Sequence, residues 1–193
     1  IEQLGLIIRT TDGKKGIEED TFVDIEDDKY NSFTPGEIKL ESMPSGLQHG
    51  INIIDNHTVA LVLYEKDKDG NRYYDYAYVM GDFNNWKRSN DENSQMYYDE
   101  SAGCWWITLS GLEPTKEYAF QYYLGKKSSV EGEKDTELRI ADPYTEKILD
   151  ASSDSYITES TYPSSQRIYP TKGAGVVSTF KIQKDSYSWA HDN

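Results

Sequence analysis

The chain has 193 residues, of which 36% are hydrophobic and 13% aromatic, and it carries a formal net charge of -14. Such acidity argues against binding to nucleic acid or to anionic membranes, because both partners favour basic patches. The length suits one ordinary domain and part of a second. The 16 tyrosines and 4 tryptophans can build a core despite a mean hydropathy of -0.78.

Other simple features narrow the chemistry further. The single cysteine, Cys104, permits no internal disulfide and leaves the redox compartment open. No apolar run of about 18 residues is present, so no membrane span is expected. The histidines, His49, His57 and His191, show neither metal-ligand nor catalytic-triad spacing. No metal, cofactor or catalytic residue is therefore expected in this chain.

Short strand patterns follow one another along the chain, separated by turn residues, and no long window has helical periodicity. This arrangement predicts an all-β sandwich. The turn Asp67–Asn71 is expected to close a hairpin between two of the strands, and Thr145–Leu149 to form one helical turn. The predicted strands are Leu4–Arg9, Thr21–Ile25, Thr58–Glu65, Tyr73–Met80, Gln95–Tyr98, Cys104–Leu109, Tyr118–Leu124 and Val176–Ile182.

Side-chain alternation predicts which faces of these strands are buried. Tyr118, Phe120, Tyr122 and Leu124 share one face of their strand. Trp105 shares its face with Ile107 and Leu109 and is expected in the core. Trp106 then points the opposite way, where it would be either an exposed platform or part of the structure.

Residues 79–86, which read VMGDFNNW, combine a strand, a tight turn and a large aromatic ring. Gly81 allows a bend, and Asp82, Asn84 and Asn85 suit a turn because their side chains bond to nearby backbone. A flat ring beside amide groups suits sugars, whose C–H faces stack on rings and whose hydroxyls need polar partners. The alternative for Trp86, Asn84 and Asn85 is a purely structural role.

This octapeptide resembles the signature of carbohydrate-binding module family 48, the module that precedes the barrel in alpha-amylase-family (glycoside hydrolase family 13) enzymes. It also resembles the glycogen-binding beta subunit of the AMP-activated kinase. Similarity covers roughly residues 44–182, starting with the first strands in 46–62. Further residues in the family order are Met96, Gly103-Cys104-Trp105, Leu109–Leu112, Tyr118–Tyr122 and Ala141-Asp142-Pro143-Tyr144.

The resemblance implies an immunoglobulin-like (early-set) β-sandwich with extra N-terminal strands. It divides the chain into 1–43, a partial β module that would pack as extra strands, 44–183, the family 48-like sandwich, and 184–193, a linker. In that linker Tyr187 and Trp189 resemble the lead-in to a catalytic barrel. The stretch Asp142-Pro143-Tyr144 is expected to anchor the chain where it turns.

The implied function is that of a non-catalytic module of a starch- or glycogen-active enzyme, such as an alpha-amylase, pullulanase or branching enzyme. The module would brace the C-terminal barrel and bind α-glucan: starch, glycogen or maltooligosaccharide. The catalytic carboxylates of that family lie on the barrel. A periplasmic or extracellular location is implied, or a cytoplasmic one for a branching enzyme.

Carbohydrate contact is expected at Trp86, Asn84 and Asn85, with Trp106 as a second platform. The kinase subunit has another tryptophan and a lysine beyond its Tyr-x-Phe strand. The corresponding loop here, Gly125–Ser129, has no tryptophan, so Tyr123 or Lys126 would have to substitute. Two alternatives stay open: an interaction module without sugar affinity, and a glycogen-sensing regulatory module.

Overall fold

The computed structural model describes residues 3–6, 21–24, 33–157 and 167–184. The chain divides into two compact units, Ile1–Thr34 and Pro35–Asn193. In the first unit, β1 (Gln3–Leu6) and β2 (Thr21–Asp24) pair antiparallel. These strands coincide with two predicted ones, whose residues 7–9 and 25 lie outside the described residues, as do residues 185–193 of the predicted linker.

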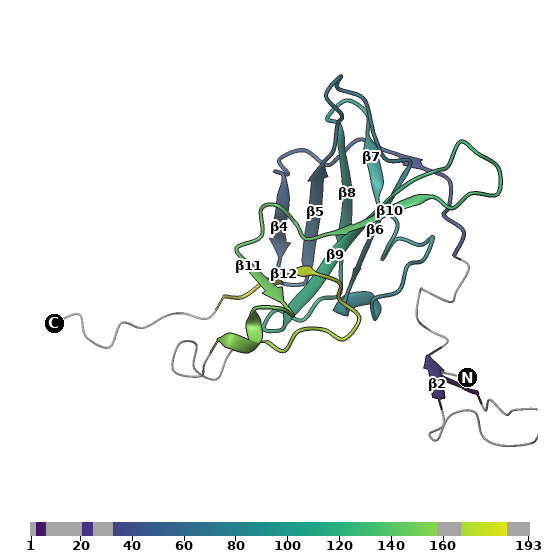
Figure 1. Ribbon diagram of the computed structural model, residues 1–193. Coiled ribbons are helices and arrows are strands. Elements are labelled where there is room, and N and C mark those ends of the chain that lie inside the picture. Colours follow the sequence, from purple (N-terminus) through teal and green to yellow (C-terminus); the bar gives the residue numbers. More distant parts are fainter. Residues whose placement is uncertain (1–2, 7–20, 25–32, 158–166, 185–193) are drawn as a thin grey trace, which may run out of the picture. The chain divides into compact units, whose positions relative to one another are not determined.

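The second unit consists of two five-stranded sheets (Figure 1), and its helical content in the described residues is limited to η1 (Asp82–Asn84) and η2 (Asp154–Tyr156). The prediction of an all-β sandwich is thereby confirmed. The first sheet has the order β3 (Lys39–Leu40), β7 (Tyr97–Asp99), β8 (Cys104–Leu109), β5 (Thr58–Tyr64) and β4 (Gly50–Asp55). The second contains β6 (Tyr76–Gly81), β9 (Glu117–Lys126), β10 (Thr136–Ile140), β12 (Val176–Lys181) and β11 (Lys147–Asp150).

The boundary between the two units falls before the predicted module boundary at residues 43 and 44. Strand β3 pairs in parallel with β7, with Lys39 opposite Tyr97 and Leu40 opposite Tyr98. Residues 35–43 therefore belong to the second unit.

Strand β9 is the centre of the second sheet. Along one edge it pairs with all of β6, from Tyr76 opposite Gly125 to Gly81 opposite Phe120. Its other edge is shared by two strands, because β10 pairs with Tyr122–Lys126 and β12 with Glu117–Phe120. Strand β11 pairs with β12 and is the outer strand on that side.

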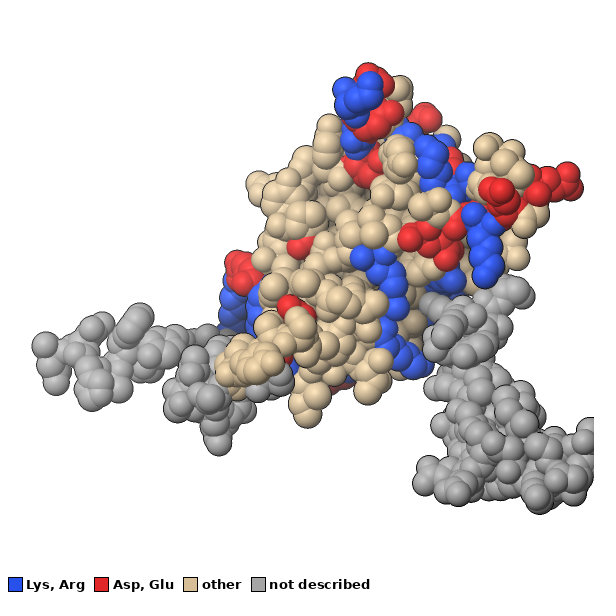
Figure 2. Space-filling view, viewed as in Figure 1, with Lys and Arg blue, Asp and Glu red and all other residues tan. Residues whose placement is uncertain are grey.

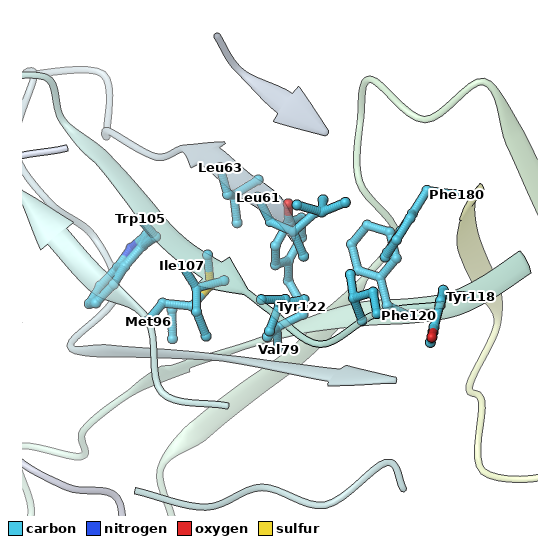
Figure 3. Packing of buried hydrophobic residues seen from close by; sticks show 14 of the residues in the cluster. Leu61, Leu63, Val79, Met96, Trp105, Ile107, Tyr118, Phe120, Tyr122 and Phe180 are labelled. Atoms are coloured by element: carbon cyan, nitrogen blue, oxygen red, sulfur yellow. The ribbon is translucent and has the colours of Figure 1, made fainter. Parts of the chain in front are cut away.

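The hydrophobic core lies between the two sheets (Figure 3). The predicted inward face of β9 is confirmed, since all four of its residues belong to this core. Trp105 is also in the core, as predicted. Its indole Nε1 donates to the buried Glu65 Oε2 at 3.2 Å. The largest core side chains include Trp105, Phe120, Tyr122, Leu61, Met96, Ile107 and Leu124.

One margin of the sandwich is closed by a segment that passes between the sheets. Val79 N donates to Ser94 O at 2.8 Å, and Met96 N donates to Ala77 O at 3.0 Å. The chain then continues as β7, which pairs with β8 in the first sheet. At the opposite margin the outer strands are β4 and β11 (Figure 1), and no backbone ladder between described residues joins them.

Two local predictions are wrong. Strand β5 lies between β8 and β4, while β6 pairs with β9, so the segment between β5 and β6 crosses from one sheet to the other. The turn at Asp67 closes on itself, because Asp67 Oδ1 accepts from the backbone of Asp69 and Asn71. The expected helical turn at Thr145–Leu149 is instead largely β11, which pairs with β12.

Asp142 anchors the chain as expected. Its Oδ2 accepts a 2.6 Å hydrogen bond from the Tyr122 hydroxyl, its Oδ1 accepts from Tyr144 N at 2.7 Å, and its own N–H donates to Ser178 Oγ at 2.6 Å. Burial raises the pKa of this carboxyl above its ordinary value of 3.8, and the bonds from Tyr122 and Tyr144 oppose that shift.

A raised native pKa means that ionisation of Asp142 weakens the fold. Its contribution to stability is fully present below 3.8 and is lost as pH rises through the native pKa. Asp142→Asn cannot ionise, so the free energy of unfolding of the variant minus that of the wild type should increase from about pH 4 upward. Urea unfolding of both proteins across this range tests the prediction, and a difference independent of pH would contradict it.

Candidate functional site

The VMGDFNNW segment forms the end of β6, the 3-10 turn η1 and a left-handed pair of residues. Asn85 has φ 54° and Trp86 has φ 61°. Asparagine adopts this conformation readily, whereas for a bulky residue it is uncommon and costs about 1–3 kcal/mol. Trp86 N donates to Gly81 O at 2.9 Å. This hydrogen bond closes the turn that ends in the two left-handed residues.

The polar side chains of this turn are used within the protein. Asn84 Oδ1 accepts from Gly81 N, and Asn84 Nδ2 donates to Val79 O and Asn93 O, all between 2.9 and 3.0 Å. Both donors of the amide are thereby satisfied. These bonds hold the turn together, and they favour a structural role for Asn84.

Asp82 ties the turn to the rest of the sandwich. Its Oδ1 accepts from Trp86 Nε1 at 3.1 Å. Its Oδ2 accepts from Ala119 N, in β9, at 2.6 Å and pairs with Arg167 Nη2 at 2.6 Å. One carboxylate thus fixes the tryptophan, the central strand and an arginine.

Trp86 itself is largely covered, with an exposed fraction of 8%. A sugar that stacks on a ring needs one face open, and little of this ring is open. Asn85 is exposed. A neighbouring pocket of about 170 Å³, lined in part by Asp82, Asn93 and Lys116, is smaller than the roughly 300 Å³ usual for ligand pockets.

Of the two alternatives for Trp106, an exposed platform is wrong, because its exposed fraction is 6%. The ring stacks on Tyr97 with centroids 4.9 Å apart and packs against Met43 and Leu47. Its Nε1 donates to Glu41 O at 3.0 Å. The segment before β4 therefore covers this ring, and that cover depends on tertiary packing which strand alternation does not reveal.

Tyr123 and Lys126 lie on β9 but make separate contacts. Tyr123 is buried against Arg88, whose guanidinium carbon is 4.0 Å from the ring centre, and its hydroxyl donates to Glu137. Lys126 Nζ lies 3.9 Å from the ring centre of Tyr73 and donates to Tyr73 O at 3.2 Å. Neither side chain forms an open platform with Trp86.

The predicted sugar contacts do not form one surface. Trp106 points outward from the first sheet, since Trp105 points into the core. Tyr123 points outward from the second sheet, since Tyr122 and Leu124 point inward. These two aromatic residues therefore lie on opposite faces of the sandwich.

A larger groove lies at the margin of the sandwich where β4 and β11 are the outer strands. It lies between β4 and the strands β11 and β12. Its volume is about 590 Å³, within the usual range of about 300–1,000 Å³ for ligand sites. Ile51, Ile53, Phe180 and Tyr144 supply apolar lining. Its charged lining includes two ion pairs, since Lys147 Nζ lies 2.9 Å from Glu117 Oε1 and Lys184 Nζ lies 2.5 Å from Glu146 Oε2, and it also includes Lys181.

A row of exposed rings adjoins this groove. Tyr144 lies 5.9 Å from His49, and His49 lies 5.2 Å from Tyr64, between ring centres. Tyr144 is 57% exposed and Tyr64 is 49% exposed. Tyr144 belongs to both the row and the groove. We name the groove and these three rings together the margin site.

Sequence patterns missed the margin site. The sequence predicts a helical turn where β11 lies, and it predicts Tyr64 only as part of the strand Thr58–Glu65. His49, Tyr64 and Tyr144 are separated along the chain and meet only after the strands pair. Gly50 is the residue at this site whose type could have indicated a close contact. In the structure it lies against Tyr144, where a Cβ would lie 2.6 Å from the tyrosine Cβ. Such a glycine permits close backbone packing.

No protein-family model matches the sequence, and no curated protein is significantly similar to it. In the described residues, no helix is long and apolar enough to cross a membrane, and no group of three or more His, Cys, Asp or Glu side chains is arranged to hold a metal ion.

Substitution of Trp86 separates a structural role from sugar contact. Trp86→Ala should lower the free energy of unfolding by about 3–5 kcal/mol, because a buried ring is lost. Trp86→Phe keeps an aromatic ring, loses the donor to Asp82 and part of the buried ring surface, and should cost less, about 1–3 kcal/mol. Urea unfolding measures both, with the exposed neighbour Lys87→Ala as control. Unchanged stability of Trp86→Ala together with lost α-glucan retention would contradict the structural role.

Asp99 holds the segment that covers Trp106. Its carboxylate accepts from the Ser101 hydroxyl and from the backbone N–H groups of Ala102 and Met43, and these bonds lower its pKa from 3.8 to about 2. Asp99→Ala should lower the free energy of unfolding by about 1.5–3 kcal/mol at neutral pH.

The effect of Asp99→Ala should depend on pH in a defined direction. A lowered native pKa stabilises the fold above 3.8, and this contribution is lost as pH falls through about 2. The stability difference between wild type and variant should therefore shrink on acidification. Acrylamide quenching at neutral pH should also increase in the variant as Trp106 becomes accessible. A constant difference and unchanged quenching would refute this assignment.

Proposed function

We propose that this chain is a non-catalytic module of an alpha-amylase-family enzyme that acts on starch or glycogen. In this proposal the second unit is an immunoglobulin-like early-set sandwich. It braces a catalytic barrel that continues from its C-terminal end, and it also binds α-glucan. A periplasmic or extracellular location goes with a starch-degrading enzyme, and a cytoplasmic one with a branching enzyme.

The observation that carries the proposal is the set of contacts around Asp82. This residue of the family-like octapeptide holds Trp86, the backbone of Ala119 in β9, and Arg167. Asp142, from another family-like segment, similarly joins Tyr122 in β9 to the chain before β11. Two family-like segments that lie far apart in the sequence are thus both bonded to β9. This supports the proposal that the second unit has the fold of that family.

These contacts favour the bracing role at the octapeptide. Its aspartate, its first asparagine and its tryptophan are bonded internally, which leaves Asn85 as the exposed residue among the expected sugar contacts. A rigid turn fixed to the central strand suits a module that holds a neighbouring domain. Glucan contact in the proposal therefore relies on other exposed aromatic residues.

A second candidate function is an interaction module without sugar affinity. The exposed apolar residues Ile53 and Ile54 on β4 and Ile148 on β11 favour it, because outer strands that present isoleucines suit contact with another protein surface. A glycogen-sensing regulatory module is the third candidate. The loop after β9, which has no tryptophan, weighs against it.

Affinity electrophoresis tests the sugar part of the proposal. The 193-residue chain should be retarded in gels that contain soluble starch or glycogen, with an affinity between about millimolar and tens of micromolar. An acidic protein of similar size controls for sieving. Absence of retardation in starch, glycogen and pullulan gels would overturn α-glucan binding and favour the interaction module.

A further inference from the structure

The exposed rings of the margin site have a fixed backbone beneath them. Tyr144 follows the anchor Asp142, to which its N–H donates, and it lies against Gly50 at the start of β4. Tyr64 ends β5, which is paired on both sides. The backbones of both tyrosines are therefore held before any ligand arrives, and a ring with few rotatable bonds adds little ordering cost.

Two ion pairs in the groove favour a neutral ligand. Lys147 is paired with Glu117, and Lys184 with Glu146, so at these four residues an anion or cation would have to compete with an existing partner. Lys181, which also lines the groove, can donate to a hydroxyl group. Hydroxyl groups can donate to the carboxylates and accept from the ammonium groups without separating them. Apolar lining by Ile51 and Phe180 adds contact for C–H surfaces.

The relative tilt of the rings limits the shape of the ligand. The planes of His49 and Tyr64 are inclined by 38°, and those of His49 and Tyr144 by 50°. A ligand that stacks face-on against more than one ring must therefore turn along its length. Chains of α-linked glucose curve in this way, whereas β-1,4-linked chains are flat and extended.

We propose that the margin site binds an oligosaccharide of α-linked glucose, with Tyr144 and Tyr64 as stacking residues and the paired charges of the groove as hydroxyl partners. This inference rests on the α-glucan part of the proposed function. It moves the sugar contact away from Trp86 to the margin between β4 and β11.

The test is isothermal titration calorimetry of the 193-residue chain with maltoheptaose, and with cellohexaose as the β-linked comparison. Wild type should bind maltoheptaose and show no heat with cellohexaose. Tyr144→Ala should weaken binding about tenfold or more, while Tyr144→Phe, which keeps the ring, should stay within about threefold of wild type. Tyr64→Ala provides an independent second variant.

Tyr156→Ala is the matched control, because Tyr156 is 83% exposed and does not line the groove. It should bind as wild type does. Thermal unfolding of each variant checks that the fold is retained, and if Tyr144→Ala is unfolded, Tyr64→Ala decides the test.

The outcomes separate this inference from the proposed function. Maltoheptaose binding that survives in folded Tyr144→Ala and Tyr64→Ala overturns the margin site and leaves α-glucan binding intact. Equal binding of cellohexaose overturns the α-linked ligand. If wild type binds neither sugar, both the site and the α-glucan capacity are wrong, and the groove is left as a surface for the barrel.

Discussion

Strand β9 is the element on which the rest of the second unit depends. Its inward face gives Tyr118, Phe120, Tyr122 and Leu124 to the core, and its two edges hold β6, β10 and β12. The same strand receives the octapeptide turn through Ala119 and Asp82. It also contributes Glu117 to the charged pair in the groove. The core, the turn and the groove are therefore positioned by one strand.

The octapeptide turn and the margin site differ in how their side chains are held. A turn tied to the central strand by Asp82 is part of the framework, and its tryptophan is covered. The margin between β4 and β11 is different, because the outer strands there are not joined and exposed rings lie beside paired charges. On the face seen in Figure 2, acidic and basic side chains are interspersed, which also suits a neutral partner despite the net charge of -14.

Sequence patterns predicted the strands and their buried faces where alternation is strong, as in β8 and β9. Residue periodicity is local, and it sufficed to place Trp105 and Phe120 in the core. It could not show that β5 and β6 lie in different sheets, because a turn with the same residues can close a hairpin or begin a crossover. It also could not show that residues 41–47 cover Trp106, or that His49, Tyr64 and Tyr144 meet, because both depend on contacts between distant segments.

Nuclear magnetic resonance of the isotope-labelled chain, titrated with maltoheptaose, tests the central claim most directly, because it locates binding without any substitution. The account predicts amide shift changes at Gly50–Ile53 and Tyr144–Lys147, with the resonances of Gly81–Arg88 nearly unchanged. Changes concentrated at Gly81–Arg88 would contradict it and would return the sugar contact to the octapeptide turn.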